Sequence, residues 1–278
     1  MAQQRSSTVG FVVLTWNSIE YVEKCLRSIL KIESRPVMLF VVDNGSVDGT
    51  VEIVEAFAAQ DRRVRLFKEP ENRGTTISRN IALRNLGDEV GYVCILDSDT
   101  IVNESAIEAL IALLESDLTI GLAGPTMRTS AGAKQLSGRN LPSLGIKLRK
   151  ACPVSSIAEK GARMEQPSAA IVDGVQDVGY LLSACWMMRR NVLEKVGLLD
   201  ERIFYAPEDV DYCVRVHRAG FRVAWYHDVE IIHEYQRLSK RKLVSKMNWE
   251  HVKGLVYFFR KYGYLFDAGK ALSEQKDV

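Results

Sequence analysis

Short β-branched and apolar runs alternate with amphipathic patterns through the first 120 residues of the chain. Four runs predict strands, at residues 9–14, 37–42, 64–67 and 90–96. Apolar residues at helical spacing follow each run, and they predict four helices that face a core. These residues are Val22, Cys25, Leu26, Ile29 and Leu30, then Val51, Val54 and Phe57, then Ile77, Ile81 and Leu83, and lastly Ile107, Leu110, Ile111 and Leu114. The alternation indicates an α/β fold built from βαβ units, with a Rossmann-like, mainly parallel central sheet flanked by helices.

The pattern fades across residues 125–175, which are rich in Gly, Ser, Pro and basic residues. A stretch of this length is either a functional lid or binding loop, or it contains elements that the pattern does not reveal. Regular patterns then return. They predict strands at 178–188, 222–226 and 229–233, and helices at 191–196, 209–219 and 238–259.

Composition narrows the class of protein. The chain has 278 residues, of which 47% are hydrophobic, enough for one large α/β domain or two small ones. A net charge of +2 does not indicate a nucleic-acid partner. Five scattered cysteines without a CxxC pair predict reduced core residues. The sequence shows neither the apolar stretch of a signal peptide nor a run of 18 apolar residues, so we expect a cytoplasmic protein.

Polar segments follow all four predicted strands. They are Thr-Trp-Asn-Ser at 15–18, Asp-Asn-Gly-Ser-Val-Asp-Gly-Thr at 43–50, Asn-Arg-Gly at 72–74 and Asp-Ser-Asp-Thr at 97–100. Each segment alone also fits a helix cap, a turn or a loop. Ligands of open parallel sheets bind beyond the carboxyl ends of the strands, however, and all four segments belong to that edge. Together they predict a ligand site.

Asp97 and Asp99 carry the most specific chemistry at this edge. They emerge two positions apart from a run of five apolar or aromatic residues. Carboxylates placed so close to a buried strand are costly to desolvate unless a cation joins them, and oxygen ligands suit Mg²⁺ or Mn²⁺. Such an ion can neutralise charge that develops on a departing diphosphate. The alternative is a pair of solvated loop aspartates.

A second acidic cluster, Glu208, Asp209 and Asp211, begins a predicted helix. The helix dipole favours acidic residues there, so capping explains one or two of them. Three neighbouring carboxylates also repel one another, which raises the pKa of at least one and favours a general base. The cluster fits both roles.

On these motifs the chain resembles the family-2 glycosyltransferases with the GT-A fold, and among them the rhamnosyltransferase-like enzymes of bacterial surface polysaccharides. The resemblance covers roughly residues 9–235 and extends through later segments. These are residues 79–80, 184–190, 196–200, 208–211 and His233. It implies a GT-A domain over 1–235, with a nucleotide-binding half at 1–120 and an acceptor-binding half at 121–235, and a C-terminal helical extension at 236–278.

The resemblance also implies roles for individual residues. Asp209 would deprotonate the acceptor hydroxyl, whose direct attack would invert the anomeric centre. Asp99 would bind the metal, and His233 would either complete the metal site or be a packed residue. Asp97 would contact the ribose or a water on the metal, while Trp186 and Glu208 would contact the acceptor. The remaining residues of the nucleotide-sugar site would be Thr15, Asn17, Asp43, Asp48, Asn72 and Arg79.

Two departures from the family pattern concern specificity. Residues 75–78 read Thr-Thr-Ile-Ser where many relatives are richer in Gly and Ala, and residues 197–200 read Gly-Leu-Leu-Asp in place of Gly-Gly-Phe-Asp. The Gln-x-x-Arg-Trp element of processive synthases is absent, which favours transfer of a single sugar. The donor remains open among UDP-, dTDP- and GDP-sugars, the acceptor between a glycan and a lipid-linked glycan, and the oligomeric state is not determined.

Residues 237–261 contain eight Lys or Arg and one acid, interleaved with aromatic residues. This composition fits a helix on the anionic inner face of the plasma membrane, and equally a helix that packs on its own domain.

Two other functions share part of the pattern. A haloacid-dehalogenase-like phosphatase also places Asp-x-Asp after a strand, but that motif normally follows the first strand and continues differently. A non-catalytic nucleotide-sugar-binding module is the other alternative, and the presence of Asp209 argues against it.

Overall fold

The computed structural model of the chain describes residues 7–234 and 246–273. The α/β fold is confirmed. The strands are β1 (Thr8–Thr15), β2 (Val37–Asn44), β3 (Val64–Glu69), β4 (Val90–Asp97), β5 (Thr100–Ile101), β6 (Ile120–Arg128), β7 (Lys134–Gln135), β8 (Gly138–Arg139), β9 (Ile171–Val172), β10 (Val175–Asp177), β11 (Tyr180–Leu181), β12 (Cys185–Arg189) and β13 (Arg222–His233). The helices are α1 (Val22–Leu30), α2 (Thr50–Gln60), α3 (Thr75–Arg84), α4 (Glu104–Ser116), α5 (Leu144–Ala151), α6 (Ser155–Glu165), α7 (Arg190–Val196), α8 (Glu208–Arg218), α9 (Lys246–Tyr262) and the 3₁₀ helix η2 (Ala268–Ala271).

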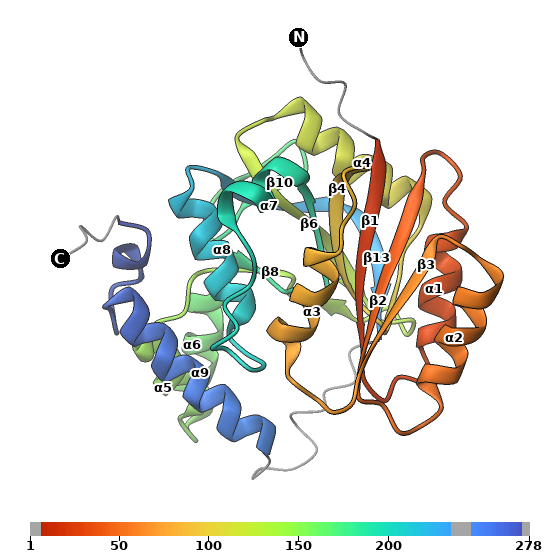
Figure 1. Cartoon of the computed structure of the whole chain (residues 1–278). Helices are drawn as coiled ribbons and strands as arrows, with labels where there is room; N and C mark the ends of the chain where they lie inside the picture. The colour runs from red at the N-terminus through yellow and green to blue at the C-terminus, as the bar shows by residue number, and fades with distance from the viewer. Residues whose placement is uncertain (1–6, 235–245, 274–278) are drawn as a thin grey trace.

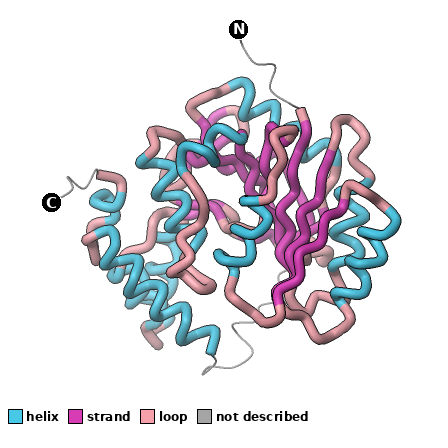
Figure 2. The backbone as a smooth tube through the Cα atoms, viewed as in Figure 1, coloured by secondary structure: helices cyan, strands magenta, loops and turns pink. Residues whose placement is uncertain are grey.

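One mixed sheet organises the molecule (Figure 2), with the strand order β3-β2-β1-β4-β12-β6-β13-β10-β9. Strands β3, β2, β1 and β4 are parallel neighbours, and β6 pairs in parallel with β13. Strand β12 is antiparallel to both β4 and β6, so it joins the two parallel groups. The sheet is therefore mainly parallel where the polar strand-end segments lie, as expected.

Each face of the sheet has its own apolar core, because side chains alternate along the strands. On β1, Val9, Phe11 and Val13 pack with α1, α2 and α4. Val12 points to the opposite face, where α3, α7, α8 and α9 pack. The two helical layers are visible on either side of the strands in Figure 1.

Of the two alternatives for residues 125–175, the structure confirms the second, because the stretch continues β6 and then forms β7, β8, α5, α6 and β9. Two local predictions required revision. The two strands predicted at 222–226 and 229–233 are one strand, β13, with a register shift against β6 between Tyr226 and Glu230. On α3, Ile77 and Ile81 are only half-buried, whereas the polar Ser78, Arg79 and Asn80 are buried.

The C-terminal helical extension is confirmed as α9, which begins at Lys246 and packs on α8 and the sheet through its aromatic face. Phe258, Phe259 and Tyr262 are buried there, together with Tyr264. The expected start of this helix at 238 and the expected domain boundary at 235 lie outside the described residues. Within the described residues, no helix is both long and apolar enough to cross a membrane.

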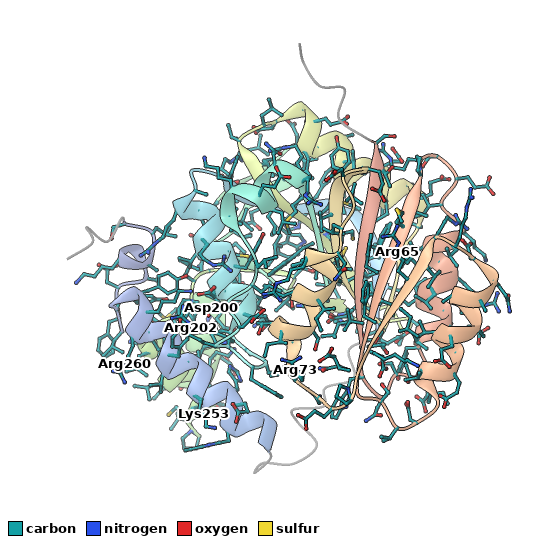
Figure 3. All side chains as sticks on the ribbon, in the orientation of Figure 1. Arg65, Arg73, Asp200, Arg202, Lys253 and Arg260 are labelled. Atoms are coloured by element: carbon teal, nitrogen blue, oxygen red, sulfur yellow. The ribbon has the colours of Figure 1, made fainter. Side chains whose placement is uncertain are left out.

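Asp200 anchors α9 to the domain. Its Oδ2 accepts hydrogen bonds from Tyr257 Oη at 2.7 Å and Lys261 Nζ at 2.8 Å, and its Oδ1 accepts from Arg202 Nε at 2.8 Å. Figure 3 shows Asp200 and Arg202 beside α9, with Lys253 and Arg260 on the same helix. Burial would raise the pKa of Asp200, but these donors lower it below its usual value.

Candidate active site

Strand register brings three of the four polar segments, those after β1, β2 and β4, to one edge. On the parallel pair β1–β2, Thr15 lies opposite Asp43, and on β1–β4, Leu14 lies opposite Asp97. The chain leaves all three strands at this edge, so the segments that follow them are neighbours. The predicted convergence of these segments is therefore present in the structure.

The loops after β1 and β2 are bonded to each other. The Asn17 N–H donates to Ser46 Oγ at 2.8 Å, and Asn17 Oδ1 accepts from the Val47 N–H at 2.9 Å. Asp48 bonds the Ile19 N–H and also the backbone N–H and hydroxyl of Thr50. Asn17 has a left-handed backbone, with φ of 49°, which the short amide side chain tolerates. Asn17 and Asp48 thus hold the two loops together.

Two buried polar atoms at this edge have no hydrogen-bond partner. Thr15 Oγ1 and Asp43 Oδ2 are both inaccessible, although Asp43 Oδ1 accepts from the Ser46 N–H at 2.9 Å. Buried polar groups are normally paired, so unpaired ones indicate a missing partner.

Asn72 and Arg79 take different places. Asn72 Oδ1 accepts from Asn44 Nδ2 and the Gly74 N–H, so it braces the loop that begins α3. Arg79, on α3, is 1% exposed and bridges two acidic side chains. Its Nη2 lies 2.5 Å from Asp97 Oδ1, and its Nη1 lies 3.5 Å from Glu208 Oε1. Arg79 therefore links the two acidic clusters that the sequence had suggested separately.

Asp97, Asp99 and His233 form a compact set of potential metal ligands. One oxygen or nitrogen from each lies within 4.8 Å of the others. Asp97 ends β4, Asp99 follows it, and His233 ends β13, which pairs with β5 directly beside Asp99. Burial and the neighbouring Asp99 raise the pKa of Asp97 despite its pair with Arg79.

The ring of His233 is oriented by Gln135 on β7. Gln135 Nε2 donates to the His233 carbonyl at 2.7 Å, so its Oε1 must accept from His233 Nδ1, 2.8 Å away. The hydrogen bond from Nδ1 fixes the ring so that its Nε2 lies 3.3 Å from Asp99 Oδ1. Burial would lower the pKa of His233, but Asp99 and Asp97 raise it above its usual value.

These three residues fit a small divalent cation. Two carboxylates and one imidazole nitrogen, arranged at the end of a buried strand, suit Mn²⁺ or Mg²⁺. A cation would also remove the repulsion between the two carboxylates that raises the pKa of Asp97.

Glu208 and Asp209 begin α8 in different surroundings. Glu208 is buried, accepts from Ser183 Oγ at 3.0 Å and faces Arg79. Burial and the neighbouring Asp209 raise the pKa of Glu208 to about 8. Asp209 is half-buried, and burial raises its pKa, while the Val210 N–H, Arg139 and Lys147 oppose the shift. Asp209 is therefore the more exposed of the two residues.

Two interpretations of the sequence were wrong. Asp211 does not join Glu208 and Asp209, because its carboxylate bonds Arg215, Lys261 and Tyr262 between α8 and α9. Trp186 cannot contact an acceptor, because it is 0% exposed, donates its indole N–H to the Leu181 carbonyl and stacks on Tyr212. Every residue of β12 is buried, so Trp186 packs beneath the site.

The sequence also missed residues that the fold brings near Asp209. Ser183 bonds both Glu208 and, through its carbonyl, Arg79. Arg139 on β8 and Lys147 on α5 lower the pKa of Asp209 through their positive charges. The only signal for them was the basic character of residues 125–175.

Solved structures establish the class of fold. The chain aligns over 93% of its length with the mannosyltransferase PcManGT of Pyrobaculum calidifontis in complex with GDP-Man and Mn²⁺, at TM-score 0.60 and 19% identity, and spans 64% of that protein. It aligns over 93% with 48% of GalNAc-T7 with UDP, GalNAc and Mn²⁺, at TM-score 0.67 and 16% identity. The fold is therefore the GT-A fold of glycosyltransferases.

The family follows from the sequence profile of Glycosyl transferase family 2, which matches residues 11–197. The chain belongs to this family and is a glycosyltransferase. It is 28% identical over 262 residues to the N-acetylglucosaminyl-diphospho-decaprenol L-rhamnosyltransferase of Mycobacterium tuberculosis, covering 88% of this chain and 82% of that one. The phosphatase alternative is thereby set aside.

Proposed function

We propose that this glycosyltransferase moves one sugar, with inversion, from a nucleotide-sugar to a glycan or lipid-linked acceptor in bacterial surface polysaccharide synthesis, and that it needs a divalent metal. The observation that carries the proposal is the Arg79 bridge, which joins the Asp97 metal cluster to Glu208 beside Asp209. The donor side, at Asp97, and the acceptor side, at Glu208 and Asp209, would therefore lie on either side of one buried guanidinium. The M. tuberculosis relative is named for a lipid-linked acceptor, and this supports the same acceptor class here.

The donor would lie along the strand ends. Thr15 and Asp43 would bind the base, because both hold a buried polar atom without a partner. Asn17 and Asp48 would hold the loops around it, and Asn72 would hold the start of α3. Arg79 would hold Asp97 in place to contact the ribose or a water on the metal.

Asp99 and His233 would hold Mn²⁺ or Mg²⁺ beside Asp97. When bound, the ion stabilises negative charge on the departing nucleoside diphosphate as a Lewis acid.

Asp209 would be the general base. Asp209 is half-buried whereas Glu208 is buried, and a raised pKa brings a carboxylate closer to the basicity that this role needs. Glu208 is occupied by Ser183 and Arg79, so it would position the acceptor side of the site. Deprotonation of the acceptor hydroxyl by one base, followed by direct attack on the anomeric carbon, inverts that centre.

The first experiment is a thermal-shift and nucleotide-release screen of UDP-, dTDP- and GDP-sugars, with Mn²⁺ and with EDTA. We expect at least one nucleotide-sugar to stabilise the protein in a metal-dependent way. If none does and Mn²⁺ has no effect, the proposal is wrong.

The second experiment separates an enzyme from a binding module. In Asp209→Asn the shape is kept but the base is lost, so transfer should fall about 10²- to 10⁴-fold while donor affinity stays the same. Asp228→Asn, on β13, is a matched control that should retain activity. Transfer by Asp209→Asn at the wild-type rate would exclude Asp209 as the base.

A further inference from the structure

Near Asp209, three basic side chains surround a single buried carboxylate. Glu165, at the end of α6, has a side chain that is only 3% exposed. Arg139 Nη1 lies 3.1 Å from its Oε2, Lys150 Nζ lies 2.5 Å from the same oxygen, and Lys147 Nζ lies 3.6 Å from Oε1. We call these four residues the Glu165 cluster, which carries two more positive than negative charges.

The cluster is not needed merely to attach α6. Asn140 already holds this junction, since its N–H donates to the Glu165 carbonyl and its Nδ2 donates to the carbonyls of Met164 and Gln166. The side chains of Arg139, Lys147 and Lys150 also stay 25%, 30% and 34% exposed. Partly exposed cations in excess around a fixed carboxylate can accept a further anion.

The fold places this cluster on the acceptor side. Arg139, on β8, lies opposite Tyr180 of β11, and β11 packs on α8, the helix that Glu208 and Asp209 begin. Arg139 and Lys147 also lower the pKa of Asp209, against the effect of burial. The Glu165 cluster therefore lies near the carboxylate that would activate the acceptor, whereas the donor diphosphate would meet the metal residues.

An apolar groove begins one helical turn away on α5. Leu144 lines it together with Val256, Leu265 and Phe266, and the charged residues Arg260, Asp267 and Lys270 also line it. Its volume is about 690 Å³, and Phe266 is 68% exposed. Because Leu144 and Lys147 are three residues apart on one helix, they lie on the same side of α5. Apolar surface thus continues directly from the cation cluster.

We propose that Arg139, Lys147 and Lys150 bind the diphosphate of a polyprenyl-diphosphate-linked acceptor, and that the groove beside α5 receives its hydrocarbon chain. The inference rests on the proposed function and specifies its acceptor class. The excess positive charge matches the negative charge of a diphosphate, and charge-assisted hydrogen bonds from Lys and Arg are the strong ones for this group. The sugar attached to the diphosphate would then extend toward Asp209.

Calorimetric titration with farnesyl diphosphate in EDTA tests the site, since it requires neither donor nor metal. We expect the wild-type chain to bind farnesyl diphosphate. The affinity of Lys147→Gln/Lys150→Gln should be lower by about tenfold or more, because two charged contacts are lost. Lys160→Gln, an exposed lysine of α6, is the matched control and should bind as wild type. Equal affinity of the wild type and the double variant would overturn the inference.

Further variants separate binding from folding. Lys147→Arg/Lys150→Arg keeps both charges and should restore binding, whereas a purely structural role would change the unfolding temperature in the Gln variant and leave the Kd unchanged. Phe266→Ser should weaken the binding of farnesyl diphosphate but not that of inorganic pyrophosphate. If pyrophosphate binds as tightly as farnesyl diphosphate to the wild type, the groove has no such role. Failure of the nucleotide-sugar screen would refute the proposed function independently of these titrations.

Discussion

His233 Nε2 lies 3.3 Å from Asp99 Oδ1, although 133 residues separate the two in the chain. Gln135 orients the imidazole through Nδ1 and turns Nε2 toward Asp99, where the two residues would share a cation. We expect His233→Ala to weaken Mn²⁺ binding about tenfold or more, and Asp99→Ala to weaken it further, because the carboxylate also supplies charge. Calorimetry or Mn²⁺ EPR measures both. His227→Ala, which removes an imidazole that stacks on Trp225, should leave Mn²⁺ affinity unchanged.

Thr15→Val tests the nucleotide pocket. The buried hydroxyl of Thr15 has no partner, so its removal should leave the free energy of unfolding unchanged or raise it by about 1 kcal/mol. Affinity for the preferred nucleoside diphosphate should nevertheless fall about tenfold. Thr126→Val is the contrasting control, since that hydroxyl accepts from Trp225 Nε1 and its loss should destabilise the fold without changing nucleotide affinity. Unchanged affinity in Thr15→Val would remove Thr15 from the pocket.

Glu208 should make stability depend on pH. Its pKa is about 8 in the folded chain against an ordinary 4.5, so the folded state holds a proton that the unfolded state has released between these values. Stability should therefore fall as pH rises from about 5 to 9, by roughly 1–3 kcal/mol from this group. Glu208→Gln lacks this dependence, so its stability relative to wild type should increase over the same range. Urea unfolding at several pH values measures the difference, and Glu23→Gln on the exposed side of α1 is the control.

Asp200 and Lys261 should be coupled in stability. Asp200→Asn and Lys261→Met each break a contact between the domain and α9, and a double-mutant cycle should give a coupling of about 1–3 kcal/mol at pH 7. Because the pKa of Asp200 is lowered in the folded chain, its contribution is present above its ordinary pKa of 3.8 and is lost as pH falls below it. The coupling should therefore shrink toward pH 2. Additive effects at pH 7 would show that the pair does not hold α9.

The sequence predicted the strand-end residues well, because Thr15, Asp43 and Asp97 each end a run whose buried pattern is unambiguous. It failed for α5 and α6, where the apolar residues Leu148, Ile157 and Met164 are exposed, so no clear core-facing stripe marked these helices. The sequence also could not predict whether Trp186 is buried or exposed. Strand β12 is buried on both faces and therefore lacks the alternation that separates inward from outward side chains.

The bulge in β13 has a consequence for how the metal residues could change over evolution. Residues 227–229 interrupt the pairing with β6, after which the strand continues to His233, opposite Thr100. Side chains alternate along a strand, so the loss of one residue within the bulge, if the pairing did not readjust, would turn the imidazole to the opposite face while leaving every ligand in the sequence. A chain could thus retain the full acidic motif and still lack the third ligand. For recognising this centre in a sequence, the spacing from residue 222 to residue 233 is as informative as the identity of His233 itself.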